Sequence, residues 1–478
     1  MDTGSPRTGG RMTVGLEISQ WKYLSDESGD PRMHCVLSVR VDGAGSAGGP
    51  DGPVLAQVLA VDCSSSMSWP VEKLHAAQQA ALAAIRKLPD GTPFAVVRGD
   101  HRASMVYPDA PGMVRASPGT RARAARAVHD LVAGGGTCIG AWLDLCRRLL
   151  AAQHAPIGHV LLLTDGKNQH DDQMPLGPVL DACDGRFVCD AWGIGDGWDG
   201  RELVGIATRL HGSADAVREE QDLPAAYEKL MDGLVAKSVP ELRISVTTMP
   251  GCSVRYLKQV FPHEAELTGE DGTNFVTRAW GDETRRYQLC LSADPEGRPR
   301  GEDLQLAVVA VDAPGTGARL PAPQPCLVHW TENPALSQHT DAQVEHFGQH
   351  QRLGEAVAAA TDAHRQGLRD EAERHLGRAV QLAHAVGAAE HLDRLARLVR
   401  VEDARAGRVV LRPEAAAVDF ERLITVSSHS TYGPSSGTAP GAGPAPDRAT
   451  TRCPRCSGAS PAAARFCPAC GHRFEERR

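Results

Sequence analysis

The sequence has 478 residues, a net charge of −8 and an isoelectric point near 6.2. A chain of this length exceeds what a single hydrophobic core supports, so we expect several domains. The acidic balance argues against nucleic acid as a partner and against a polybasic membrane anchor. No run of about 18 apolar residues is present, so no membrane-spanning helix is predicted.

The cellular compartment is predicted from the N-terminus and the cysteines. Residues 1–12 lack the apolar stretch of a secretory signal. Of the 13 cysteines, four form one cluster near the C-terminus and the others are scattered singly. An odd count with one tight cluster favours a metal site in a reducing compartment over a disulfide framework. We therefore expect a cytoplasmic protein.

The first segment of the chain, residues 1–50, is predicted to be a tail followed by β-strands. Two strand-like runs lie at residues 14–18 and 35–41, and the second alternates apolar and polar side chains as a half-buried strand does. A loop rich in glycine, aspartate and proline then leads to the next segment.

Residues 51–238 alternate between strand-like and helix-like patterns. The continuous apolar run at 54–61 is typical of a strand buried on both faces, and 159–164 has the same character. Such an alternation predicts an α/β domain with a doubly wound, mostly parallel sheet and helices on both faces.

Polar side chains occupy three loops of this domain. Asp62, Ser64 and Ser66 follow the first buried strand, Asp165 follows the second, and Thr137 precedes a predicted helix. The first loop alone is also consistent with an ordinary helix cap. Because loops at the carboxyl ends of parallel strands converge, we expect all five side chains to meet. Two carboxylates and three hydroxyls without thiolate or imidazole suit Mg²⁺, which keeps water ligands and so leaves a position open.

These three loops resemble the metal-ion-dependent adhesion site of the von Willebrand factor A domain. Asp62, Ser64 and Ser66 match its Asp-x-Ser-x-Ser loop, Thr137 its threonine loop, and Asp165 its third-loop aspartate. The resemblance implies a site for Mg²⁺, or for Mn²⁺ or Ca²⁺, at which an Asp or Glu of a protein partner completes the metal's ligands. In this family the aspartates often act through water, so Asp62 and Asp165 are expected to lie behind the hydroxyls.

Other residues beside these loops allow two interpretations. Cys63 and Cys138 flank predicted ligands, and a thiol of low pKa there would make the site sensitive to redox conditions. We favour the alternative that both are small buried apolar residues. Lys167 and residues 170–172 either line the rim of the site or belong to a solvated loop.

Residues 239–332 change to period-two runs separated by Gly, Asp and Pro turns, which predicts an antiparallel β-sandwich. We expect the strands before Asp42 to join it, so that the A domain is inserted in, or flanked by, the sandwich. The alternative is two unconnected β-segments.

Residues 333–426 are rich in Ala, Leu, Arg and Glu and are predicted to be helical. The spacing resembles a degenerate tetratricopeptide unit, although a small hairpin or three-helix bundle fits the length better. The histidines of this region are expected on solvated helix faces: His339, His346, His350, His364, His375, His384 and His391. Residues 427–451 are rich in Ser, Thr, Gly and Pro and are predicted to be a flexible linker.

The C-terminal segment, residues 452–478, carries two Cys-x-x-Cys pairs, Cys453 with Cys456 and Cys467 with Cys470. Two such turns close a tetrahedral Zn²⁺ shell, and four thiolates leave no open position, so the role is structural. The segment resembles a short zinc ribbon. Its surrounding arginines suit protein docking or charge balance better than nucleic-acid binding.

The sequence favours a binding protein over an enzyme. It has no Gly-x-Ser-x-Gly elbow, no phosphate-binding loop with its lysine, and Asp62-x-Ser64 where a haloacid-type phosphatase would have two aspartates. We therefore expect a metal-dependent adaptor or scaffold, with a metal-dependent phosphoesterase as the alternative. By analogy with bacterial relatives of the A domain, the expected partners are Ser/Thr kinases, phosphatases or AAA+ ATPases.

Overall fold

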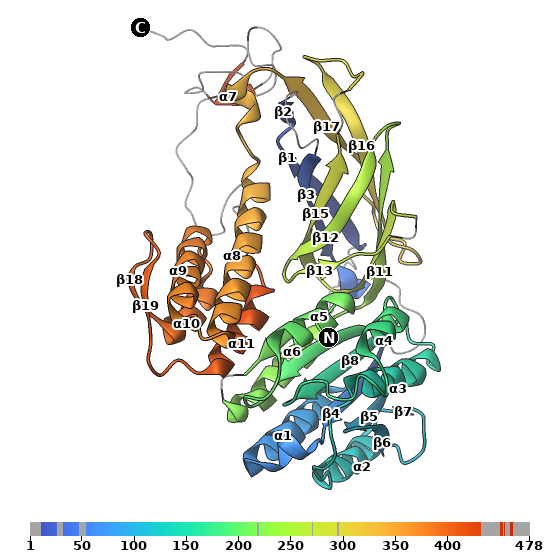
Figure 1. Ribbon diagram of the computed structural model, residues 1–478. Helices are drawn as coiled ribbons and strands as arrows, with labels where there is room; N and C mark the ends of the chain where they lie inside the picture. Colours follow the sequence, from blue (N-terminus) through green and yellow to red (C-terminus); the bar gives the residue numbers. More distant parts are fainter. Residues whose placement is uncertain are drawn as a thin grey trace, which may run out of the picture. The chain divides into compact units, whose positions relative to one another are not determined.

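The computed structural model describes residues 11–25, 32–46, 54–217, 219–269, 271–293 and 296–431, and further on residues 450–452, 454 and 459–461. Residues 1–433 form one unit and residues 434–478 a second. In the first unit, Figure 1 shows an α/β sheet, two mainly antiparallel sheets and a group of helices. The further division at 51, 239, 333 and 427 stays a prediction.

The α/β sheet has seven strands in the order β10-β9-β8-β4-β5-β6, with β7 paired to β5. β4 pairs in parallel with both β5 and β8, and β8 pairs in parallel with β9, whereas β6 and β7 run antiparallel to β5. Every residue of β4 is buried, as its continuous apolar run predicts. The bounds are β4 (Leu55–Asp62), β5 (Pro93–Gly99), β6 (Ala103–Tyr107), β7 (Val114–Arg115), β8 (Ile157–Thr164), β9 (Val188–Gly193) and β10 (Ala214–Ala216).

Helices cover both faces of this sheet because successive side chains of β4 point to opposite sides. Leu59 and Val61 pack with α1 (Val71–Lys87), α2 (Pro118–His129) and α6 (Leu223–Val235). Val58 and Ala60 pack with α3 (Ile139–Ala151), α4 (Leu176–Cys183) and α5 (Gly200–Arg209). Short 3₁₀ turns are η1 (Ala44–Ser46), η2 (Ser65–Ser68) and η3 (Glu220–Asp222). The predicted α/β layering is confirmed.

Two five-stranded sheets share one hydrophobic core, and all their strands pair antiparallel except β2, which runs parallel to β17. β3 pairs antiparallel with β15 along its whole length, so the strands before residue 42 and those after 239 build the same sandwich. The α/β segment lies between them in sequence. One sheet contains β1 (Thr13–Gln20), β3 (Arg32–Asp42), β15 (Glu283–Ser292), β12 (Ser253–Phe261) and β13 (Ala265–Glu266). The other contains β14 (Asn274–Trp280), β11 (Val239–Thr248), β16 (Asp303–Asp312), β17 (Gln324–Thr331) and β2 (Tyr23–Ser25).

The region from 333 onward is helical, but it also contains a β-hairpin that its composition did not predict. Strands β18 and β19 pair antiparallel after α10 and lie before α11, the helix that contacts α5 and α8. The bounds are α7 (Pro334–Ser337), α8 (Ala342–Arg365), α9 (Arg369–Val386), α10 (Ala389–Leu398), β18 (Val399–Asp403), β19 (Arg408–Leu411) and α11 (Ala417–Ser427).

Three histidines of this region are buried, so the prediction that they face solvent is wrong for them. His346 and His350 lie one turn apart on α8, and the His350 ring stands 4.9 Å from that of His346 and 5.9 Å from that of His391 on α10. The apolar pattern of α8 did not reveal that another segment of the chain covers the face that carries His346 and His350.

That segment is residues 428–431, which the sequence assigned to the linker. The backbone N–H of Glu264 donates to the carbonyl of Ser428 at 2.8 Å, and the ring of His429 bonds the carbonyl of Ala214 at 3.1 Å. The hydroxyl of Thr431 lies 2.9 Å from Nε2 of His350. Residues 428–431 therefore join the α/β sheet, the sandwich and α8, and we call them the C-terminal strap.

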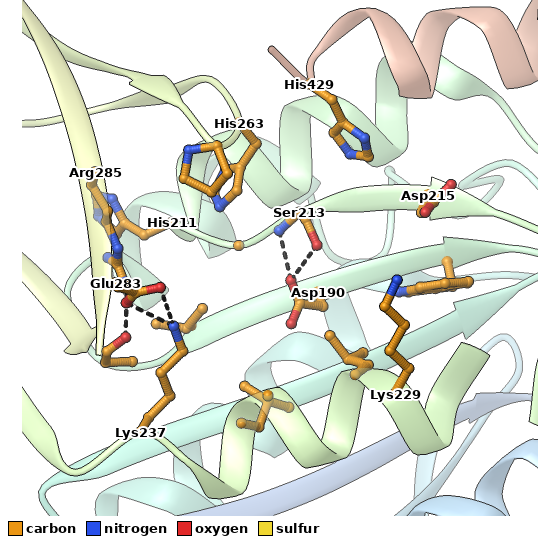
Figure 2. Close-up of a pocket in the computed structure, with 18 of the residues that line it drawn as sticks. Asp190, His211, Ser213, Asp215, Lys229, Lys237, His263, Glu283, Arg285 and His429 are labelled. Atoms are coloured by element: carbon orange, nitrogen blue, oxygen red, sulfur yellow. Dashed lines mark hydrogen bonds and ion pairs between the residues drawn. The ribbon is translucent and has the colours of Figure 1, made fainter. Parts of the chain in front are cut away.

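A cavity of about 750 Å³ lies where β9, β10 and α6 meet β15 and the C-terminal strap (Figure 2). Asp190 lies on its wall and accepts hydrogen bonds from the N–H and hydroxyl of Ser213 at 2.6 and 2.7 Å. At one end Lys237 pairs with Glu283 at 2.6 Å. Burial favours the neutral carboxyl of Asp190, but His159 and Ser213 hold its pKa at about 2. Polar side chains thus line the contact between the α/β sheet and the sandwich.

In the second unit the described residues include a two-stranded hairpin of β20 (Thr450–Arg452) and β21 (Ala459–Pro461). The predicted zinc ligands Cys453, Cys456, Cys467 and Cys470 lie outside the described residues. Across the described part of the chain, no helix is both long and apolar enough to cross a membrane.

Candidate metal site

The site begins at Asp62, the last residue of β4, where the chain leaves the sheet. The Asp62 carboxylate is buried and accepts a hydrogen bond from the N–H of Ser64 at 2.7 Å. Neighbouring loops hold this turn in place: the N–H of Cys63 donates to the carbonyl of Gly99 at 2.7 Å, and that of Ser65 to Gly135 at 2.8 Å. The backbone therefore fixes the direction of the serine side chains.

The second carboxylate oxygen of Asp62 faces the neighbouring strand β8. It accepts a hydrogen bond from the hydroxyl of Thr164 at 2.6 Å and a longer one from the N–H of Asp165 at 3.3 Å. Burial raises the pKa of Asp62 to about 6, even though the bonds from Ser64 and Thr164 favour its charged form. The parallel register of β4 and β8 brings these residues to the same edge of the sheet.

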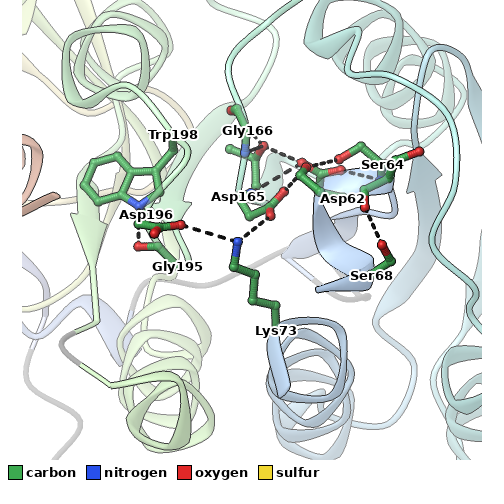
Figure 3. A network of polar contacts seen from close by, with 12 residues as sticks. Asp62, Ser64, Ser68, Lys73, Asp165, Gly166, Gly195, Asp196 and Trp198 are labelled. Carbon is green, nitrogen blue, oxygen red and sulfur yellow. Dashed lines mark hydrogen bonds and ion pairs between the residues drawn. The ribbon is translucent and has the colours of Figure 1, made fainter. Parts of the chain in front are cut away.

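Ser64, Ser66 and Asp165 form a continuous chain of hydrogen bonds. The two serine hydroxyls are 2.9 Å apart, and the hydroxyl of Ser66 donates to Oδ1 of Asp165 at 2.6 Å. Figure 3 shows this network from Ser64 to Asp165. Each carboxylate thus accepts hydrogen bonds from protein donors, a hydroxyl among them in both cases.

Thr137 lies in the loop before α3. The N–H of Gln169 donates to the Thr137 carbonyl at 2.8 Å, and the side chain of Asn168 accepts from the first N–H of α3 at 2.9 Å, so the β8–α4 loop holds the threonine in place. Its hydroxyl is buried and has no hydrogen-bond partner among the described residues. A Cβ on Gly166 would stand 3.2 Å from this hydroxyl and 3.6 Å from that of Ser66, so glycine permits the close approach of the three loops.

Lys73 is a residue of the site that the sequence did not single out. It lies in the first turn of α1 and is almost completely buried. Its ammonium is 3.2 Å from Oδ2 of Asp165 and 3.5 Å from Oδ1 of Asp196 (Figure 3). A lysine seven residues after Ser66 carries no motif of its own. No local pattern points to it, because its partner Asp165 is 92 residues away in sequence.

The two cysteines beside the site are buried. Burial raises the pKa of Cys63 to about 12, so its thiol is not the low-pKa group that redox sensitivity requires. The structure therefore favours the reading of Cys63 as a small apolar residue. On the rim, Lys167 is more than half exposed and lies 3.8 Å from Asp199, while the ring of His170 lies 6.5 Å from that of His101.

The donor set fits a hard divalent cation. The structure brings together all five predicted side chains, Asp62, Ser64, Ser66, Thr137 and Asp165, at one edge of the sheet. A buried hydroxyl without a partner costs about 1–3 kcal/mol, and a metal ion would satisfy it. Within the described residues, no group of three or more His, Cys, Asp or Glu is placed to hold a metal, so this candidate depends on its hydroxyls.

Comparison with known proteins agrees with the fold. Residues 56–216 match the family model of the von Willebrand factor type A domain. The chain is 28% identical over 217 residues to an uncharacterized protein of Synechocystis sp., and the match covers 44% of this chain and 49% of that protein. The chain thus spans about half the length of this curated relative.

Two solved structures are similar over most of the chain. A von Willebrand factor type A protein from Catenulispora acidiphila has a TM-score of 0.78 and 29% identity, and the match covers 90% of this chain and 99% of that one. The ArnB paralog VWA2 from Sulfolobus acidocaldarius has a TM-score of 0.50 and 13% identity, covering 87% and 98%, and shares the fold alone. The chain therefore contains a von Willebrand factor A domain.

Proposed function

We propose that the A domain holds Mg²⁺, or Mn²⁺ or Ca²⁺ in its place, and captures an acidic side chain of a protein partner at it. The observation that carries this proposal is the buried, unpartnered hydroxyl of Thr137, next to the linked hydroxyls of Ser64 and Ser66. Such a grouping of lone pairs near two carboxylates is typical of a hard-cation site rather than of a packed core.

Each residue has a distinct role in this proposal. Ser64, Ser66 and Thr137 would hold the ion, while Asp62 and Asp165 orient the hydroxyls and supply the negative charge. The bound ion would contribute a positive charge and an open coordination position that a carboxylate oxygen can fill. The residues of the chain would supply only part of the six ligands that Mg²⁺ prefers, so water or the partner would supply the rest.

Binding is favoured over catalysis because both carboxylates of the site already accept hydrogen bonds from protein groups. Both carboxylates accept hydrogen bonds from hydroxyls at 2.6 Å, so neither is a free general base. As partners we propose a Ser/Thr kinase, a phosphatase or an AAA+ ATPase, on the resemblance to bacterial A-domain proteins. The nine cysteines that the structure describes are all free thiols, which supports a reducing, cytoplasmic setting.

The test is capture of partners from lysate by the full-length protein in Mg²⁺ and in EDTA. A protein bound in Mg²⁺ and eluted by EDTA is expected for the wild type and is expected to be lost with Ser64→Ala/Ser66→Ala. Ser68→Ala is the matched control, because the exposed Ser68 hydroxyl only bonds the carbonyl of Ser65. Equal capture in Mg²⁺ and EDTA would contradict the proposal.

The same preparations test the phosphoesterase alternative. Turnover of p-nitrophenyl phosphate that depends on Mg²⁺ and is abolished by Asp165→Ala, while partner capture persists, would replace the binding proposal with an enzymatic one. We expect no such turnover.

A further inference from the structure

Lys73 places a buried positive charge directly behind the candidate metal ligands. The side chain is 8% exposed and that of Asp165 is fully buried, so their ion pair at 3.2 Å is shielded from water. Asp165 therefore accepts from Ser66 through one oxygen and from Lys73 through the other. A buried carboxylate of this kind needs a compensating charge, and Lys73 provides it without a metal.

The position of Lys73 also depends on the loop after β9. Gly195 has a φ of +70°, and a Cβ there would stand 2.5 Å from Cε of Lys73. The next residue, Asp196, is the second carboxylate beside the Lys73 ammonium, although its own side chain is mostly exposed. Glycine at 195 thus leaves the space through which the lysine reaches Asp165.

We propose that Lys73 is the resident counter-cation of Asp165 in the metal-free protein, and that it weakens divalent-metal affinity and links metal occupancy to the Gly195–Asp196 loop. This inference rests on the proposed metal site and concerns its regulation. A divalent ion held beside Asp165 and the Lys73 ammonium repel each other and share the same carboxylate. Removing the lysine charge leaves Oδ2 of Asp165 without its lysine partner, while Oδ1 still accepts from Ser66.

The loop that Lys73 contacts leads to the helical region. Asp199 accepts from Arg365 of α8 at 3.1 Å, and the N–H of Gly200 donates to the carboxylate of Glu421 on α11 at 2.9 Å. Arg365 also pairs with Glu421 at 2.6 Å. Asp196, which Lys73 contacts, thus precedes the contact of this loop with α8 by three positions and its contact with α11 by four.

The test compares full-length Lys73→Met and Lys73→Arg by calorimetric Mg²⁺ titration. We expect Lys73→Met to bind Mg²⁺ on the order of tenfold more tightly than wild type, because a positive charge close to the ion is gone. Lys73→Arg keeps the charge and is expected within about threefold of wild type. Thermal unfolding is measured in parallel. Mg²⁺ is expected to raise the melting temperature of Lys73→Met by more than that of wild type. The reason is that in EDTA the variant has neither a lysine nor a metal ion to compensate the charge of Asp165.

A second variant displaces the lysine without changing its charge. Gly195→Ala would push the Lys73 stem away and is expected to tighten Mg²⁺ binding in the same direction. Gly91→Ala is the matched control: Gly91 also has a positive φ, of +87°, but has open space around it. It shares the backbone strain and is expected to leave Mg²⁺ affinity unchanged.

The outcomes separate this inference from the proposed function. If wild type binds Mg²⁺ and Lys73→Met and Gly195→Ala bind it equally well or more weakly, the role of Lys73 is refuted while the metal site stands. If wild type binds no divalent ion, both are refuted.

Discussion

At the scale of single residues, the hydroxyls of Thr137 and Ser66 differ in their hydrogen bonding. It is buried and has no hydrogen-bond partner among the described residues, whereas the Ser66 hydroxyl donates to Asp165. An ordinary turn would satisfy both hydroxyls. The two side chains therefore make different contributions to the stability of the metal-free protein.

Thr137→Val tests this difference. Because valine has the same shape and removes an unsatisfied group, we expect the metal-free stability to be unchanged or raised by up to about 1 kcal/mol. Mg²⁺ affinity is expected to fall by about tenfold or more. Urea unfolding in EDTA and calorimetric titration measure the two quantities.

Ser66→Ala is the control, since it removes a hydrogen bond to a buried carboxylate as well as a ligand. It is expected to cost about 1–3 kcal/mol in EDTA in addition to metal affinity. A Thr137→Val protein that loses stability in EDTA but binds Mg²⁺ normally would mean that the threonine is structural.

At the scale of elements, the buried histidines between α8, α10 and the C-terminal strap make stability depend on pH. Burial lowers the pKa of His350 to about 3 and that of His391 to about 4. The unfolded chain protonates these rings below about pH 6.5, whereas the folded chain does so only near their lowered pKa values. The stability they provide is therefore complete above pH 6.5 and is lost as the pH falls.

We expect the free energy of unfolding to fall by about 2 kcal/mol per ring between pH 7 and pH 5. Urea unfolding across this range measures the slope, and His391→Phe is expected to make it shallower. His375→Phe is the comparison, because His375 lies on α9 and is not among the buried histidines. A slope that His391→Phe leaves unchanged would contradict the burial of His391 as the cause.

The four C-terminal cysteines are predicted to hold one zinc ion. A segment with so small a core folds with its metal, so we expect one Zn²⁺ per chain in protein purified under reducing conditions. Elemental analysis measures it, and Cys453→Ser/Cys456→Ser is expected to remove the zinc while leaving Mg²⁺ binding intact. Wild-type protein without zinc would refute the ribbon.

Several elements could be predicted because strands that are buried on both faces consist of continuous apolar residues. β4 and β8 are continuous apolar runs followed by aspartates, and their loops then converge for reasons of sheet topology. β18 and β19 were missed because they lie among helix-forming residues and are held by tertiary contacts. Lys73 was missed for a related reason: its partner Asp165 is 92 residues away in sequence.

At the scale of the molecule, the C-terminal strap closes the first unit. The strap forms backbone bonds with the sandwich, and His429 and Thr431 bond Ala214 and His350. Ending the chain after residue 433 is expected to leave the melting temperature of the first unit nearly unchanged.

Ending it after residue 427 removes the strap and is expected to cost about 3 kcal/mol or more, at about 1 kcal/mol per hydrogen bond. Thermal unfolding of the two truncated proteins measures the difference. Equal melting temperatures would show that the strap contributes nothing to the packing of the first unit.

The order of the segments was predictable in outline, but the contacts of the C-terminal strap were not. Period-two runs on both sides of the α/β segment indicated one sandwich, and the pairing of β3 with β15 agrees with that expectation. The strap carried no such signal, since Ser428, Ser430 and Thr431 resemble linker residues. Their role arises from backbone groups and histidines distant in sequence.

The most direct measurement is calorimetric titration of Mg²⁺ into the full-length protein and into Ser64→Ala/Ser66→Ala. Saturable binding of one ion at the A-domain site is expected for the wild type, and its loss is expected in the variant, because two of the three hydroxyls that would hold the ion are gone. No saturable binding to the wild type, or equal binding to both proteins, would contradict a metal-dependent function for this site.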